Sequence, residues 1–190
     1  MASVAKVDRV LDAAYDCLTR HGIRKTTMDD IAAAAGMSRP AVYQYVRNKE
    51  DAYRRLAQRI YGQALDQAQA EAVAGGTLTQ RLDRVLAVKL GLTQALFRDT
   101  PHAGELLRVS ADLDRAFADD MADLLAATIT DVAEEANLRL TSDHAREVAV
   151  LALALTRGLE GDADPDRQRD RLRNGVALLI AGLAAATAPR

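Results

Sequence analysis

The stretch GMSRPAVYQYVRNKED, residues 36–51, concentrates side chains that can bind nucleic acid, although only 4% of the chain is aromatic. Arg39 carries a fork of N–H donors that can pair with O6 and N7 of guanine. The hydroxyls of Tyr43 and Tyr45 can donate to phosphate oxygens. Lys49 would add a cation beside an expected helix N-terminus, where phosphate binds well. These residue types at this spacing predict a surface that contacts DNA.

Two short helices would position these side chains. Thr27 and Asp30 form a capping-box pair that predicts the start of the first helix, and Gly36 ends it. Ser38 and Pro40 predict the start of the second, because serine caps a helix and proline fits its first turn. Two short helices joined by a glycine-containing turn form the helix-turn-helix pattern, with the preceding helix packed behind them.

The spacing within the second short helix separates a buried side from an exposed side. Val42 and Val46 lie four residues apart and are expected to face inward together with Met37. We expect Tyr45, at the edge of the other side, to be a half-buried support and Tyr43 to contact the DNA backbone. The exposed face would consist of Arg39, Pro40, Tyr43 and Gln44, with Ala41 between them.

The segment TTMDDIAAAAGMSRPAVYQYVRNKEDAY resembles the N-terminal domain of TetR-family transcriptional regulators. The resemblance covers residues 5–55, and the rest of the chain matches only in length and helix count. It implies an N-terminal DNA-binding domain and a variable C-terminal domain for effector binding and dimerisation. Met28 stands where a family member has a base-reading arginine, so we do not expect a base contact there.

The pattern and the resemblance together define a set of expected DNA contacts. Roles without DNA contact stay open for two of these residues, since Thr27 could act only as a helix cap and Arg39 could be a solvated charge. The expected DNA-binding residues are Thr26, Thr27, Arg39, Pro40, Ala41, Tyr43, Gln44, Tyr45 and Lys49.

Charge is distributed unevenly along the chain. The formal net charge is −2, but residues 1–60 hold eleven Lys and Arg against seven Asp and Glu. That segment therefore carries +4, and the remainder carries −6. A basic N-terminal segment followed by an acidic remainder is expected when only one end of a protein contacts phosphate.

The fold class predicted from the sequence is all-α, with about nine helices. Helical periodicity runs throughout, and no hairpin signal separates alternating apolar runs. We expect a three-helix helix-turn-helix domain at residues 1–48 and a helical effector-binding and dimerisation domain at residues 49–190. Beyond the first three helices, the expected ranges are 49–74, 79–98, 101–109, 112–137, 142–160 and 165–185.

The last two helices are candidates for a dimer interface. Residues 148–155, VAVLALAL, are apolar on every side, and the last helix contains VALLIAGLAAA. Two such helices from each of two chains would form a four-helix bundle with two-fold symmetry. Core helices with no role in dimerisation are the alternative. The expected interface residues are Val148, Leu151, Leu155, Leu159, Val176, Leu179 and Leu183.

A small-molecule pocket is the expectation for the centre of the body. An apolar cavity with a few polar groups is the usual form of such a site. The alternative is that the apolar residues of these helices simply form the core, with Lys89 pointing outward and His102 capping a helix or facing solvent. The expected pocket residues are Leu86, Leu90, Thr93, Phe97, His102, Phe117 and Met121.

No catalytic or metal-binding pattern is apparent. The three histidines, His21, His102 and His144, are far apart in sequence, and no glycine-rich phosphate loop or Gly-x-Ser-x-Gly motif occurs. We therefore expect no enzyme activity, no cofactor and no metal. Cys17 is the only cysteine and is expected to be a small core residue. With no apolar run of about 20 residues and no signal peptide, we expect no membrane partner and a cytoplasmic location.

These observations favour a ligand-responsive DNA-binding regulator, expected to be a repressor. It would bind a pseudo-palindromic double-stranded operator as a homodimer and be released by an unknown small molecule. Two alternatives stay open. One is a DNA-binding regulator with no small-molecule effector, and the other is a helical binding protein whose head no longer reads DNA.

Overall fold

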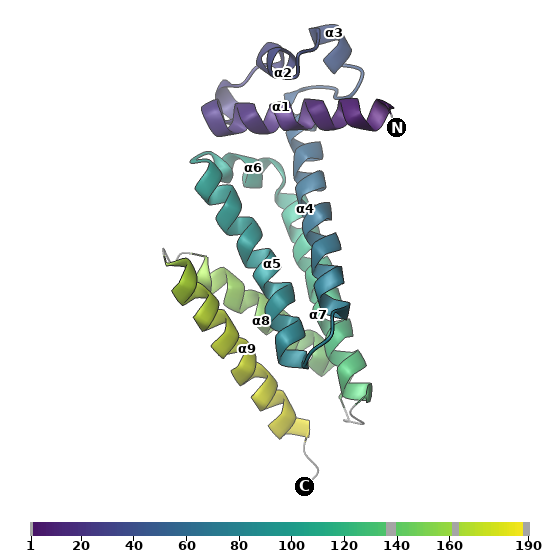
Figure 1. The fold of residues 1–190 in the computed structure, drawn as a ribbon, viewed down its shortest axis with the longest axis vertical. Coiled ribbons are helices and arrows are strands. Elements are labelled where there is room, and N and C mark those ends of the chain that lie inside the picture. The colour runs from purple at the N-terminus through teal and green to yellow at the C-terminus, as the bar shows by residue number, and fades with distance from the viewer. Residues whose placement is uncertain (1, 136–139, 161–163, 188–190) are drawn as a thin grey trace. The chain divides into compact units, whose positions relative to one another are not determined.

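The computed structural model describes residues 2–135, 140–160 and 164–187, and the described residues form nine helices with no strand (Figure 1). This confirms the all-α prediction. The helices are α1 (Ala2–Lys25), α2 (Met28–Ala34), α3 (Arg39–Val42), α4 (Lys49–Val73), α5 (Leu78–Asp99), α6 (Ala103–Val109), α7 (Ala111–Glu135), α8 (Ser142–Leu159) and α9 (Pro165–Thr187).

Helix α1 contains a break at Gly22. Gly22 adopts φ 75° and ψ 165°, so the helical hydrogen bonding is interrupted there before the chain reaches Lys25. This backbone region is almost exclusive to glycine, because a Cβ atom would clash with the neighbouring peptide. The break redirects the chain towards the start of α2.

The chain divides into two compact units. The first, called the head below, comprises residues 1–62 and 95–115, and the second, called the body, comprises residues 63–94 and 116–190. Helices α4, α5 and α7 each run from one unit into the other. The head contains the segment 1–48 expected to bind DNA together with the first half of α4 and the whole of α6.

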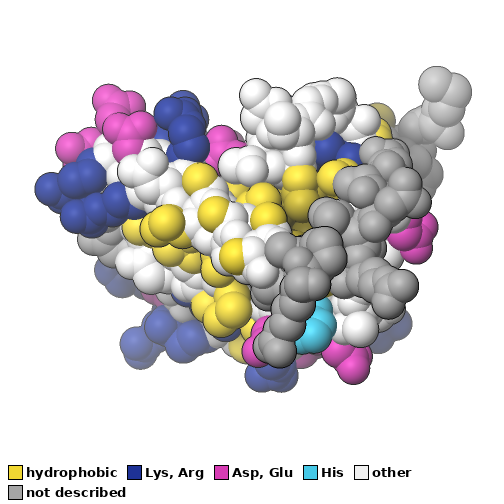
Figure 2. Space-filling view, turned by 90° about the horizontal axis from the view of Figure 1, so that it is seen from below, with side chains coloured by type: hydrophobic (Ala, Val, Ile, Leu, Met, Phe, Trp, Pro, Cys, Tyr) yellow, Lys and Arg dark blue, Asp and Glu magenta, His cyan; other side chains and the backbone are white. Residues whose placement is uncertain are grey.

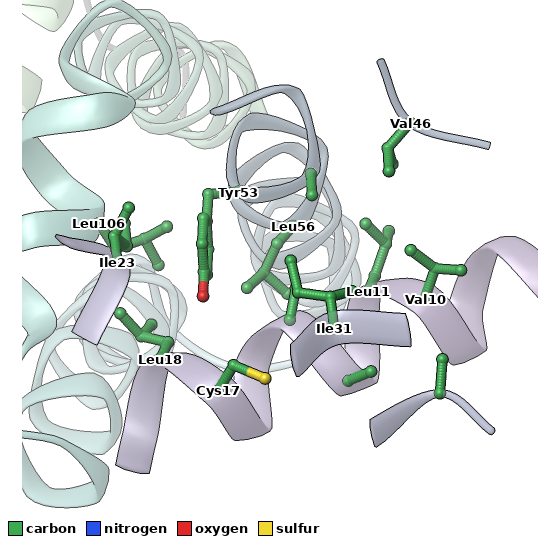
Figure 3. Packing of buried hydrophobic residues seen from close by; sticks show 14 of the residues in the cluster. Val10, Leu11, Cys17, Leu18, Ile23, Ile31, Val46, Tyr53, Leu56 and Leu106 are labelled. Atoms are coloured by element: carbon green, nitrogen blue, oxygen red, sulfur yellow. The ribbon is translucent and has the colours of Figure 1, made fainter. Parts of the chain in front are cut away.

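The head has a core built around α1 and α4. Tyr53 and Leu56 of α4 lie against Leu18 and Cys17 of α1, and Leu106 of α6 packs nearby (Figure 3). All five are buried, and burial raises the pKa of the Tyr53 hydroxyl to about 12. Cys17 is buried as expected, and burial likewise raises the pKa of its thiol.

In the body, α8 and α9 lie side by side (Figure 1). The side chain of Leu155 on α8 occupies the space that a Cβ atom on Gly175 of α9 would need. The absence of a side chain at Gly175 therefore lets the two helices approach closely at this point.

Candidate nucleic-acid interface

Capping interactions fix the ends of α2 and α3. The Thr27 Oγ1 atom accepts from the Asp30 backbone N–H at 3.2 Å, and Asp30 Oδ2 accepts from the Thr27 N–H at 2.8 Å. This is the predicted capping box, and hydrogen bonds from Thr27 lower the pKa of Asp30. Ser38 caps α3 through the Ala41 N–H, also as predicted. The two helices therefore hold their side chains on a defined backbone.

The turn of helix that begins at Arg39 separates buried from exposed residues as the spacing predicts. Val42 and Val46 are buried in the head core, and Met37 packs against it. Tyr43 is 42% exposed, whereas Tyr45 is half-buried against the same core. Four side chains are exposed on the outer side, with the half-buried Ala41 among them: Arg39, Pro40, Tyr43 and Gln44.

Arg39 is held by two neighbours at once. Its Nη1 atom lies 3.0 Å from Asp29 Oδ2, and its Nη2 atom donates to the Tyr43 hydroxyl at 3.3 Å. The guanidinium carbon also lies 5.7 Å from the centre of the Tyr43 ring. The hydrogen bond to Tyr43, followed by the charge of Asp29, raises the pKa of Arg39. The arginine is thus an oriented charge rather than a freely moving one.

Two of the expected DNA contacts have their polar atoms engaged within the head. The Thr26 side chain is buried and its hydroxyl donates to the Gly22 carbonyl at 2.8 Å, so the expected phosphate contact from this hydroxyl does not fit the structure. The Lys49 Nζ atom donates to the Thr26 carbonyl at 2.9 Å and lies half-buried. Both residues hold the connection between α1 and α2. Met28 is buried.

Acidic residues from residues 95–115 bind the rest of the head. Glu105 Oε2 accepts from the Arg24 backbone N–H at 3.0 Å, and this bond contributes most to a lowered pKa of Glu105. Arg54 of α4 pairs with both carboxylate oxygens of Asp112 at 2.7 Å. Sequence reasoning missed these contacts, because their partners lie 58 to 81 positions apart and carry no local pattern.

The residues expected to line a pocket divide between the two units. Phe97 and His102 belong to the head, where Phe97 is exposed and the His102 ring lies 3.1 Å from Glu105. The others belong to the body. Four of them have the burial of ordinary core side chains, which is the alternative the sequence left open: Leu86, Leu90, Phe117 and Met121.

Lys89 does not point outward as expected. It is buried, and its Nζ atom pairs with Glu160 Oε1 at 2.9 Å. The hydroxyl of Thr93 lies 3.3 Å from the same oxygen. A buried ammonium needs such a partner, because an unpaired charge is costly to remove from water. Of the expected pocket residues, Thr93 is therefore part of a polar cluster between α5 and the end of α8.

Several apolar side chains of α8 and α9 are exposed, and together they are called the exposed apolar strip: Val150, Leu151, Ala154, Ala177, Leu178 and Ala181. This set differs in part from the expected dimer interface. Leu151 is 51% exposed and Leu178 is 74% exposed. Leu159 and Val176 are buried in their own chain, so the expectation that they face a partner is wrong. The remaining expected residues are half-buried: Val148, Leu155, Leu179 and Leu183.

Side chains at the end of the body where α9 finishes can be seen in Figure 2, in which hydrophobic groups gather among polar ones with charges at the edge.

Across the described residues, no helix is long and apolar enough to cross a membrane. Nor do the described His, Cys, Asp and Glu side chains form a group of three or more that could hold a metal ion.

Residues 10–56 match the sequence model for bacterial regulatory proteins of the tetR family. This segment of the head is therefore similar to the N-terminal part of that family. The matched segment contains both short helices and the first turns of α4, which confirms the resemblance stated from the sequence.

Solved structures extend the likeness of fold to nearly the whole chain. A candidate transcriptional regulator from Pseudomonas aeruginosa PAO1 is 18% identical with a TM-score of 0.73, over 96% of this chain and 93% of that one. A TetR-family transcriptional regulator from Streptomyces coelicolor is 20% identical with a TM-score of 0.63, over 93% and 98%. The SmeT protein in its complex with triclosan is 20% identical with a TM-score of 0.66, over 96% and 91%. The chain thus has the fold of TetR-family transcriptional regulators.

Proposed function

We propose that this protein is a transcriptional repressor that binds a pseudo-palindromic operator as a homodimer and is released by a small molecule. The observation that carries the DNA-binding part is the outer side of α3 and of the turn that follows it, where Arg39, Tyr43 and Gln44 are exposed while Val42 and Val46 are buried. Arginine and glutamine can read base edges in the major groove, and tyrosine can donate to phosphate.

Dimerisation is supported by the exposed apolar strip on α8 and α9. Apolar patches that remain exposed on one chain commonly mark protein–protein contacts. A two-fold dimer would present two α3 helices to successive major grooves, about 34 Å apart or a multiple of it. The operator would then consist of two half-sites related by the same symmetry.

Release by a small molecule is supported by likeness of fold to SmeT, which has been solved as a triclosan complex. In this chain, α4 passes from the body into the head and is the proposed route of coupling. Ligand binding in the body would shift α4 and change the separation of the two heads. A coupling of about 1–3 kcal/mol would change operator affinity by roughly 5- to 150-fold.

The experiment that tests this function is selection of bound sequences from a random duplex library at a fixed, stated salt concentration. We expect enrichment of a pseudo-palindrome by the native protein and weakened enrichment by Tyr43→Ala. The operator so found would then be used to screen small molecules for loss of binding. Failure of the native protein to enrich any sequence at low salt would overturn the proposal.

A further inference from the structure

We propose that Asp29 is a specificity-determining residue, which fixes the Arg39 guanidinium in the plane and direction needed to read a guanine. The inference rests on the proposed function, because it concerns how the α3 face distinguishes bases. Asp29 itself lies on α2, and none of the expected DNA contacts included it.

The two contacts of Arg39 leave other N–H donors of its guanidinium available for a base. A guanidinium has five N–H groups, two of them on each terminal nitrogen. Asp29 occupies one donor on Nη1, and the Tyr43 hydroxyl occupies one on Nη2. One N–H remains on each terminal nitrogen and one on Nε, so donors remain for the O6 and N7 atoms of guanine.

Both partners of Arg39 stand on fixed backbone. Asp29 lies in the first turn of α2, directly between the two capping-box residues Thr27 and Asp30 in sequence. Tyr43 is the residue directly after α3, and its backbone N–H donates to the Arg39 carbonyl at 3.2 Å. Arg39 is therefore anchored at both ends of its fork before any DNA arrives. Such preorganisation reduces the entropy lost on binding.

Exposure argues that the pair serves recognition and not stability. The Arg39 side chain is 52% exposed and that of Asp29 is 67% exposed. Ion pairs exposed to this degree contribute little to folding. A carboxylate on a surface that meets phosphate also opposes binding to DNA of any sequence. Its presence there is explained if the loss of general affinity is balanced by a gain in discrimination.

The test compares Asp29→Asn with the native protein on the operator obtained by library selection. Arg39→Ala first identifies the base pair that Arg39 reads, as the position whose preference disappears. We expect the native protein to discriminate against other bases there by about 5- to 150-fold, the range of one bidentate contact. In Asp29→Asn this discrimination should fall at least threefold, while binding to unrelated DNA at low salt becomes tighter.

Two further variants separate positioning from charge and from misfolding. Glu50→Gln removes the same charge from another exposed acid of the head, so it should tighten general binding and leave discrimination unchanged. Tyr43→Phe keeps the ring but removes the second acceptor, so it should weaken discrimination at the same base pair. Circular dichroism would verify that each variant folds.

Equal behaviour of Asp29→Asn and Glu50→Gln, with the native base preference intact in both, would overturn the inference while leaving the proposed function standing. Absence of any sequence preference in the native protein would overturn both. Loss of preference at the Arg39 base pair in Asp29→Asn alone would support the positioning role.

Discussion

The α2–α3 face and the exposed apolar strip of the body differ in how their chemistry is held. On α2 and α3, caps and side-chain hydrogen bonds orient a few polar groups such as Arg39. On α8 and α9, exposed side chains such as Leu151 and Leu178 need only shape and area, since hydrophobic contact has no direction. DNA recognition by the first face should therefore be sensitive to the loss of single atoms. Dimerisation through the second should be sensitive to the insertion of a charge.

The largest expected effect comes from placing charges in the apolar strip. Leu151→Asp combined with Leu178→Asp should raise the dimer dissociation constant by about 30-fold or more, since a loss of about 2 kcal/mol over the two positions together corresponds to that factor. Operator affinity should fall with dimerisation, because one head alone contacts one half-site. Analytical ultracentrifugation and operator binding would be measured on the same samples.

Val73→Asp is the matched control for that double variant, since Val73 is another exposed apolar side chain but lies outside the strip, at the end of α4. It should leave both measurements unchanged. A double variant that remained dimeric and bound operator normally would show that the strip is not the dimer interface.

The next effect tests whether the head depends on backbone conformation. Gly22→Ala forces a side chain into a region of φ and ψ that costs about 1–3 kcal/mol, and its Cβ would lie 2.7 Å from His102 Nδ1. We expect the free energy of unfolding to fall by at least this amount, as measured by urea denaturation. Gly62→Ala, in the helical interior of α4 with open space around it, should instead raise stability by up to about 1 kcal/mol.

The corresponding glycine of the body depends on space and not on conformation. Gly175→Ala would push against Leu155, and overpacking costs about 1–3 kcal/mol. The better helix propensity of alanine offsets about 1 kcal/mol of this. We expect a net loss of roughly 1 kcal/mol, against a small gain for Gly182→Ala on the same helix, where no atom lies within 4 Å. Equal stabilities for the two variants would contradict close packing at Gly175.

The smallest effect concerns acid stability of the head. Hydrogen bonds from Arg54 lower the pKa of Asp112 from 3.8 to about 2. A carboxylate whose pKa is lowered by folding stabilises the folded state above its unfolded pKa, and this contribution is lost as pH falls through the folded pKa. Unfolding free energy should therefore decline between about pH 4 and pH 2, and less steeply in Arg54→Gln. Parallel declines in the two proteins would show that the pair does not contribute.

How far the sequence predicts the structure depends on how far apart along the chain two interacting residues lie. Thr27, Asp30 and Ser38 were placed correctly because a cap and its target lie three residues apart. Val42 and Val46 followed from helical spacing. Lys89 was misplaced, because its partner Glu160 is 71 residues away and no local pattern announces it.

The apolar helices show a second limit. Because α8 and the second half of α9 are apolar on several sides, periodicity could not select the exposed stripe. The expected Leu159 and Val176 proved to be buried, while Val150 and Leu178, not among the expected residues, are exposed. The resemblance covers only the head, and so offered no correction there.

The contribution of residues 95–115 to the head core has a consequence for protein engineering. A hybrid protein made by joining residues 1–62 to the body of another protein of this fold would lose Leu106, Glu105 and Asp112 from the head. The break at Gly22 and the arginine at position 54 would then be left without their partners. A modular exchange must therefore transplant both segments together, or replace the second with one whose acids and leucines fit the same surface.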